Sequence, residues 1–220
     1  MPVNFTKYLI ATGIAILLHA VGLIGLLYFN QQFFENTTPI NLLLMLLLLV
    51  WTQTEKNKWF FIFFLICFLT GLGVEIIGIQ YGVLFGHYHY GDILGYKIRQ
   101  VPVILGVNWF IVIYGSGSCI YLLGRKYMGK ISMAIAVIFG GALLAVFYDW
   151  LMEPVAVRLD FWYWNGDRPV PFFNYICWFL IGAFLLSIYY ACKFNKLNKF
   201  AVNLMLIQML FFLMLRFFLN

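Results

Sequence analysis

Charged residues are scarce in this sequence. They make up 10% of the 220 residues, while hydrophobic residues make up 64%. A soluble domain is usually about one-quarter charged and about half apolar. The scarcity excludes an ordinary soluble domain and leaves no stretch for a separate one. We therefore expect an all-α polytopic integral membrane helical bundle that forms a single domain, residues 1–220.

Histidines are also few, and this limits the metal chemistry. The three are His19, His87 and His89, whereas membrane di-iron oxygenases use many histidines in repeated boxes. The sequence also lacks the aspartate-rich pairs that hold magnesium and diphosphate in prenyltransferases, and the last apolar run has no lysine for a retinal pigment. We expect no cofactor and no metal. The metal-dependent alternative is one site made of His87, His89, Asp92 and Glu75.

Cysteines and basic residues carry little functional signal. The four cysteines have no metal-ligand or redox spacing, so we expect buried thiols. They are Cys67, Cys119, Cys177 and Cys192. The net charge of +6 comes from short loops between apolar runs and forms no basic stripe, so we expect no nucleic-acid partner.

Seven apolar runs approach the roughly 20 residues that a spanning helix needs. They are Tyr8–Phe29, Ile40–Trp51, Trp59–Gln80, Val101–Leu123, Ile131–Met152, Phe172–Cys192 and Phe200–Leu219. The second run is short, so the count is seven helices, or six if that run only dips into the membrane. The first run lacks a small-residue cleavage motif, and we interpret it as a retained span.

The loops alternate in basic content. Nine of the 14 basic residues fall on the side of the N-terminus: Lys7, Lys56, Lys58, Arg125, Lys126, Lys130, Lys193, Lys196 and Lys199. The other side carries Lys97, Arg99, Arg158, Arg168 and Arg216. The positive-inside rule then predicts a cytoplasmic N-terminus and an external C-terminus, in a bacterial inner membrane.

Polar residues converge on the less basic side. Glu75 lies late in the third run, Asn108 early in the fourth, Asp149 and Glu153 close the fifth, and Asn174 opens the sixth. Because successive helices alternate in direction, all of these residues reach the same membrane face. Ionisable groups at membrane depth cost several kilocalories per mole, so this convergence predicts a functional site.

The two long connections, 81–100 and 153–171, lie on that same face. Long connections are more often functional than short ones. The first contains the run GHYHYGD, and the second contains LDFWYWNGD. Their candidate substrate- or water-binding side chains are His87, Tyr88, His89, Asp92, Trp162 and Trp164.

Each candidate also has a purely structural interpretation. Glu75 alone is consistent with a buried hydrogen-bonding group, and His19 with an interhelical contact. Asn174 is suited to capping its helix. Trp162 and Trp164 are typical of an interfacial aromatic belt. Only the convergence of all of them favours a site.

The site composition favours acid–base chemistry on a membrane-soluble substrate. Asp149 and Glu153 are four residues apart and share a helical face. Two close carboxyl groups in an apolar setting do not both ionise, so one keeps a proton for general acid catalysis. Aromatic faces stabilise positive charge. The set suits protonation of an isoprenoid double bond to a tertiary cation, with Asp149 the first candidate acid and Glu75 the second.

Five ordered motifs carry a family resemblance: GHYHYGD, VPVILGVNWFIVIYGS, YDWLMEPVA, LDFWYWNGD and VPFFNYICWF. Together they resemble the carotenoid 1′,2′-hydratase family of membrane proteins over about 71–186. The resemblance implies a cofactor-independent hydro-lyase that adds water to the terminal double bond of an acyclic ψ-end group. The substrate would be of the γ-carotene, lycopene or bacterioruberin-precursor type. The matching motifs contain Glu75, His87, His89, Asp92, Asn108, Asp149, Glu153 and Asn174.

Two alternatives remain at this stage. A carotenoid end-group cyclase or isomerase would form the same cation but exclude water. A non-enzymatic membrane transporter would leave the polyene unaltered. In each case the expected partners are a carotenoid and the lipid bilayer, and the resemblance adds other carotenoid-pathway enzymes.

Overall fold

The computed structural model describes residues 5–166 and 170–219, so Arg168 lies outside the described residues. Its helices are α1 (Phe5–Tyr28), α2 (Gln31–Asn36), α3 (Thr38–Thr52), α4 (Lys58–Tyr81), α5 (Ile104–Gly124), α6 (Lys130–Ile135), the π-helical η1 (Ala136–Gly140), α7 (Gly141–Arg158), α8 (Phe172–Ala191) and α9 (Lys199–Phe218). Its strands are β1 (Tyr88–Tyr90), β2 (Lys97–Ile98), β3 (Val101–Pro102) and β4 (Trp162–Trp164).

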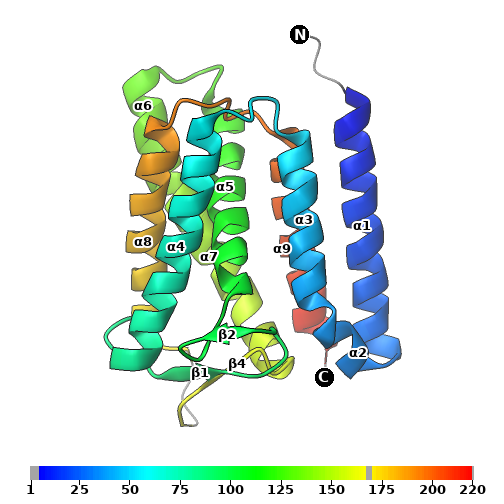
Figure 1. Ribbon diagram of the computed structural model, residues 1–220. Helices are drawn as coiled ribbons and strands as arrows, with labels where there is room; N and C mark the ends of the chain where they lie inside the picture. Colours follow the sequence, from blue (N-terminus) through cyan, green and yellow to red (C-terminus); the bar gives the residue numbers. More distant parts are fainter. Residues whose placement is uncertain (1–4, 167–169, 220) are drawn as a thin grey trace.

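The predicted fold class is confirmed. Over the described residues, six helices are long and apolar enough to cross a membrane, and α6, η1 and α7 act as one of them. The second apolar run forms α3, which is apolar but has only 15 residues. At 1.5 Å per residue α3 is about 22 Å long, less than the roughly 30 Å hydrocarbon core. Figure 1 shows the long helices side by side, with the N-terminus at one end and the C-terminus at the other.

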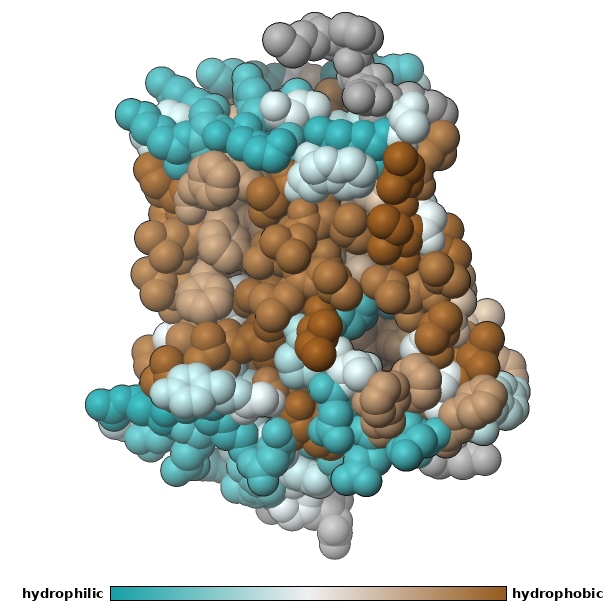
Figure 2. Space-filling view, turned by 45° about the vertical axis from the view of Figure 1, so that its right-hand side comes forward, coloured by the Kyte–Doolittle hydropathy of each residue, from teal (hydrophilic) through white to brown (hydrophobic). Residues whose placement is uncertain are grey.

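The outer surface of the bundle carries an apolar belt on the face seen in Figure 2. Figure 2 shows it as a brown band between two hydrophilic bands. Large side chains such as Leu17, Leu65 and Leu143 are more than half exposed on this surface. Helix α5 differs, since it is buried over most of its length and contacts α3, α4, α7, α8 and α9. It is the central helix around which the others pack.

Two span boundaries near the converging polar residues differ from the sequence prediction. The fifth span continues to Arg158, past the predicted end at Met152, so its two carboxylates lie inside the helix. The fourth begins at Ile104, because Val101 and Pro102 form strand β3 instead. A residue before proline is biased toward extended backbone, which favours this outcome.

The two long connections pair with each other, which the sequence analysis did not anticipate. Strands β1 and β4 are antiparallel, with Tyr88 opposite Trp164 and Tyr90 opposite Trp162. At the end of β1, Gly91 passes so close to the other connection that a Cβ atom there would lie 2.0 Å from the Asp160 carbonyl oxygen. Figure 1 shows these strands under one end of the bundle. The pairing therefore forms a floor at the end where the polar residues converge.

Close packing of α4 against α5 generates a stability prediction. A Cβ atom on Gly106 would lie 2.6 Å from the Phe68 ring and 2.8 Å from its carbonyl oxygen, whereas one on Gly73 meets nothing within 4 Å. We expect Gly106→Ala to cost about 1–3 kcal/mol because the helices must separate. Gly73→Ala is the matched control and should unfold like the parent protein. Thermal unfolding in detergent measures both, and equal midpoints would contradict this account of the helix contact.

Candidate functional site

The β1–β4 pair presents one face to the bundle and one to the outside. Successive strand residues alternate between faces. The inward set is Tyr88, Tyr90, Trp162 and Trp164. On the opposite face, His89 and Tyr163 stack with ring centroids 5.1 Å apart. Four aromatic side chains with polar hydrogens are thus directed at the carboxylates above them.

Glu75 is the first of these carboxylates, and it is buried near the end of α4. Its Oε2 accepts hydrogen bonds from the hydroxyls of Tyr88, at 2.5 Å, and Tyr90, at 2.7 Å. Its Oε1 accepts one from the Trp109 indole N–H of α5, at 3.0 Å. Burial, and next the negative charge of Glu75, raise the pKa of both tyrosines, so both hydroxyls remain donors.

Glu153, on α7, is the second carboxylate and has a similar set of donors. Its Oε2 accepts from the indole N–H groups of Trp162, at 3.1 Å, and Trp164, at 3.0 Å. Its Oε1 accepts a longer bond, 3.4 Å, from the side-chain amide of Asn174. Donor groups from β4 and α8 therefore occupy both oxygens of this carboxylate.

Asp149, one turn earlier on α7, has far fewer donors. The Asn174 amide donates to its Oδ2 at 2.7 Å and so bridges the two acidic residues of α7. Within the described part of the chain, Oδ1 accepts no hydrogen bond. Asp149 is almost completely buried, with 1% of its surface exposed. Of the three acidic groups, Asp149 is thus the one that can carry a proton on an oxygen without displacing a hydrogen-bond donor.

The three acidic groups line one small cavity of about 30 Å³. At roughly 10–15 Å³ for each water, this space suits about two water molecules. Asn108 also lines it, and the stacked indoles of Trp109 and Trp178, with centroids 4.0 Å apart, form part of its wall. A proton source, water-sized space, an amide and aromatic faces therefore meet in one polar pocket.

A second, larger cavity adjoins the polar pocket. It measures about 300 Å³ and lies among α1, α3, α7 and α9, with mainly apolar walls. His19 and Gln208 line this second cavity and not the polar pocket. The His19 Nδ1 pairs with the Ala15 carbonyl of its own helix at 2.8 Å, and its ring meets the edge of Phe211.

Most of the site residues predicted from the sequence come together, and three do not. The pocket lining includes Glu75, Tyr88, Asn108, Asp149, Glu153, Trp162, Trp164 and Asn174. His87, His89 and Asp92 do not line it. His89 faces outward and pairs with Asn165 at 3.1 Å. His87 packs over Gly82, where the positive φ of 64° and the close imidazole leave no room for a Cβ atom.

Asp92 lies on the outer surface, where it forms an ion pair with Lys97 at 2.6 Å. The hydrogen bond from Lys97, and its positive charge, hold the pKa of the Asp92 carboxyl below its usual range. Nowhere in residues 5–166 or 170–219 do three His, Cys, Asp or Glu side chains gather at metal-binding spacing.

Sequence reasoning missed six residues that line the pocket: the apolar Phe85, Leu105 and Met152, and Tyr90, Trp109 and Trp178, which carry a polar hydrogen. Tyr90 was detectable, because it lies two positions after Tyr88 and an extended segment would place both on one face. Trp109 and Trp178 carry no such signal. Their contacts depend on how α4, α5 and α8 rotate against one another, and only the folded bundle determines that.

The fold and the pocket define a polytopic α-helical membrane protein with buried acidic groups gathered at one end of its bundle. A family-level comparison then agrees with the resemblance in the motifs. The profile of the carotenoid biosynthesis protein family matches residues 37–220, and the chain belongs to this family.

One curated relative is the bisanhydrobacterioruberin hydratase of Haloarcula japonica. It is 29% identical over 119 residues, which are 52% of this chain and 39% of the relative. The match thus spans well under half of the relative's length. No solved structure matches this chain. Family and relative together support a carotenoid hydratase-family protein.

The alternation along β1 and β4 yields a matched pair of substitutions. Tyr90→Phe removes a donor from the buried Glu75, whereas Tyr163→Phe removes a hydroxyl from the outer face. We expect Tyr90→Phe to cost about 1–3 kcal/mol, because the buried Glu75 carboxyl loses one of its three donors. Tyr163→Phe should stay within about 0.5 kcal/mol of the parent protein, as surface changes usually do. Thermal unfolding would refute the assigned faces if Tyr163→Phe were the more harmful change.

Proposed function

We propose that this protein is a hydratase that adds water to the terminal 1′,2′ double bond of an acyclic carotenoid ψ-end group. The observation that carries the proposal is the unequal supply of donors to the three acidic groups. Glu75 and Glu153 each accept three hydrogen bonds, and Asp149 accepts one. A carboxylate that accepts several hydrogen bonds is stabilised in its charged form.

Asp149 is the general acid in this proposal. Indole and amide N–H groups donate and cannot accept a proton, so the groups around Glu153 favour its anion. Two nearby anions then favour the neutral form of the third acid. Asp149, with its free Oδ1, keeps the proton that the reaction consumes.

The first step forms a carbocation. Asp149 transfers its proton to the carbon next to the branched terminus, the π bond breaks, and positive charge develops on the tertiary carbon. The carboxylates of Glu75 and Glu153 stabilise this charge electrostatically. The aromatic faces of Trp109 and Trp178, with Tyr88, Trp162 and Trp164, add cation–π stabilisation.

The second step captures water. The polar pocket is large enough for about two waters, and the Asn108 amide lines it. The water oxygen bonds to the tertiary carbon, and its released proton passes to the carboxylates, so the site ends with the proton count it began with. The product carries a tertiary hydroxyl. The same cation without water would lead to a cyclised or isomerised end group.

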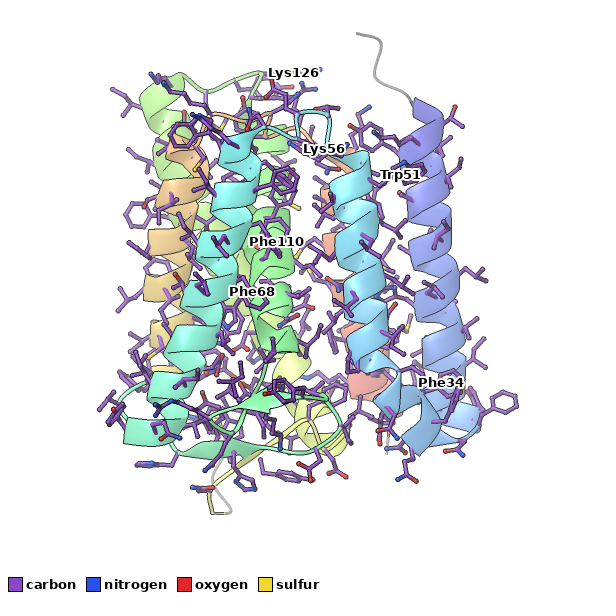
Figure 3. The ribbon with its side chains drawn as sticks, viewed as in Figure 1. Phe34, Trp51, Lys56, Phe68, Phe110 and Lys126 are labelled. Atoms are coloured by element: carbon purple, nitrogen blue, oxygen red, sulfur yellow. The ribbon has the colours of Figure 1, made fainter. Side chains whose placement is uncertain are left out.

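The charge distribution supports an orientation for this chemistry. Lys56 and Lys126 lie at the end of the bundle away from the strands (Figure 3), as do the other basic loops of the N-terminal side. We propose that this end faces the cytoplasm of a bacterial cell and that the pocket lies near the outer leaflet of the inner membrane. The polyene would remain in the bilayer while its end reaches the pocket.

Asp149→Asn tests the assigned acid. Asparagine keeps the shape and the hydrogen bond to Asn174 but supplies no acidic proton. In a lycopene-accumulating host we expect hydrated product to fall by about 100-fold or more, at an unchanged level of protein in the membrane. The pigments are separated by chromatography and weighed by mass spectrometry, where a hydrated product is heavier by one water. Full activity of this variant would remove Asp149 from the mechanism.

A second measurement follows the reaction of the parent protein in heavy water. In heavy water the hydrated product should carry one carbon-bound deuterium, on the carbon that receives the acid proton. A pigment with a new end group that has gained no water would instead identify a cyclase or isomerase. An unaltered pigment would favour a transporter.

The outer face of the floor gives a second functional prediction. His89 and Asp92 belong to matching motifs but do not line the pocket. We expect His89→Ala and Asp92→Asn to form hydrated carotenoid at close to the parent rate in the same host. Loss of product in either variant, with normal protein levels, would mean that these side chains take part in the reaction.

A further inference from the structure

We propose that the apolar cavity among α1, α3, α7 and α9 binds the terminal part of the substrate's polyene chain and opens sideways to lipid between α1 and α3. This inference rests on the proposed function, because it names where that substrate lies. It adds a binding site and an entry route that are separate from the acidic groups.

The cavity adjoins the polar pocket. Four residues line both spaces: Leu105, Asn108, Met152 and Trp162. The end of a chain held in the larger cavity is therefore separated from the small one by no more than these shared side chains. Its end meets Asn108 at the boundary, next to the water-sized space that Asp149 lines.

The opposite end of the cavity reaches the lipid-facing surface. Among its lining residues, the apolar side chains of Val21 on α1 and Ile40 on α3 are 48% and 59% exposed. At the inner end, Tyr148 and Met152 are buried. Figure 2, turned to bring the α1 and α3 side forward, shows a hollow in the lower half of the belt. The opening thus faces the bilayer rather than water.

The lining chemistry selects a hydrocarbon occupant. None of the lining residues is Asp, Glu, Lys or Arg, so a charged lipid headgroup finds no partner there. The volume of about 300 Å³ is at the lower end for small-molecule sites. A linear carotenoid is much longer than such a cavity, so it binds end-on and leaves the rest of its chain in the bilayer.

Gly22 of α1 is the position best suited to block this cavity. It lines the space, and a Cβ atom there would lie 3.7 Å from the Phe211 ring, an ordinary van der Waals distance. A small side chain is therefore tolerated, while a leucine side chain would extend into the cavity. Gly13, on the same helix, lies outside the lining and has nothing within 4 Å of such an atom.

Lycopene binding to the detergent-solubilised full chain tests the proposal. We expect Gly22→Leu to weaken binding by roughly tenfold or more, because leucine takes volume that the polyene end needs. Gly22→Ala and the control Gly13→Leu should bind like the parent protein. Asp149→Asn should also bind normally, since it changes the chemistry and not the cavity. The measured quantity is lycopene retained per protein, over a titration.

A second pair of variants covers the case in which Gly22→Leu does not fold. Leu44 lines the cavity on α3, whereas Leu47 of the same helix is exposed outside it. Leu44→Trp should weaken lycopene binding, and Leu47→Trp should not. Lycopene binding by Gly22→Leu and Leu44→Trp that equals binding by the parent protein would overturn the proposal. Losses of binding in Gly13→Leu and Leu47→Trp as large as those in the cavity variants would also overturn it.

The binding test separates this inference from the proposed reaction. Lycopene binding that depends on Gly22 and Leu44, without any hydrated product, would reject the reaction and support the cavity. Hydration that continues unchanged in Gly22→Leu and Leu44→Trp would support the reaction and reject the cavity. A saturated fatty acid that displaces lycopene as well as a second carotenoid does would show a general acyl-chain site and also overturn the assignment.

Discussion

The structure depends on one constraint: acidic groups buried in an apolar bundle need hydrogen-bond donors. An unpaired buried charge costs several kilocalories per mole, and lipid supplies no water to offset it. Here the donors come from four separate elements, β1, β4, α5 and α8. The acidic groups can therefore stay at this depth only when the two long connections are paired beneath them and the helices are packed together.

This constraint also explains the uneven character of the site. Glu75 and Glu153 each accept hydrogen bonds from two aromatic side chains of the floor, which favour the charged form of a carboxylate. Asp149 shares one amide with its neighbour and keeps an oxygen free. In the proposed function, Glu75 and Glu153 keep their charge and Asp149 supplies the proton. The arrangement suits an acid that must lose its proton beside charges that remain in place.

The two cavities differ in volume and in the polarity of their walls. The polar pocket has room for water and little else, whereas the apolar cavity has ten times the volume and no charged wall. Asn108 is one of the residues that line both spaces, and in the proposed function hydrocarbon and water meet there. A bundle that admits a hydrophobic chain from the side, and keeps water at its end, can combine two reactants that do not mix in the bilayer.

The sequence alone determined the family and the end of the bundle at which the polar residues gather. That end follows from counting residues along helices that reverse direction, so Glu75, Asn108, Asp149 and Asn174 were correctly brought together. The tertiary structure decided which way each side chain faces. The phase of a strand is set by its partner, and a shift of one residue exchanges its faces. The partner of β1 lies in a distant connection, so only the fold could direct Tyr88 and Tyr90 inward and His89 outward.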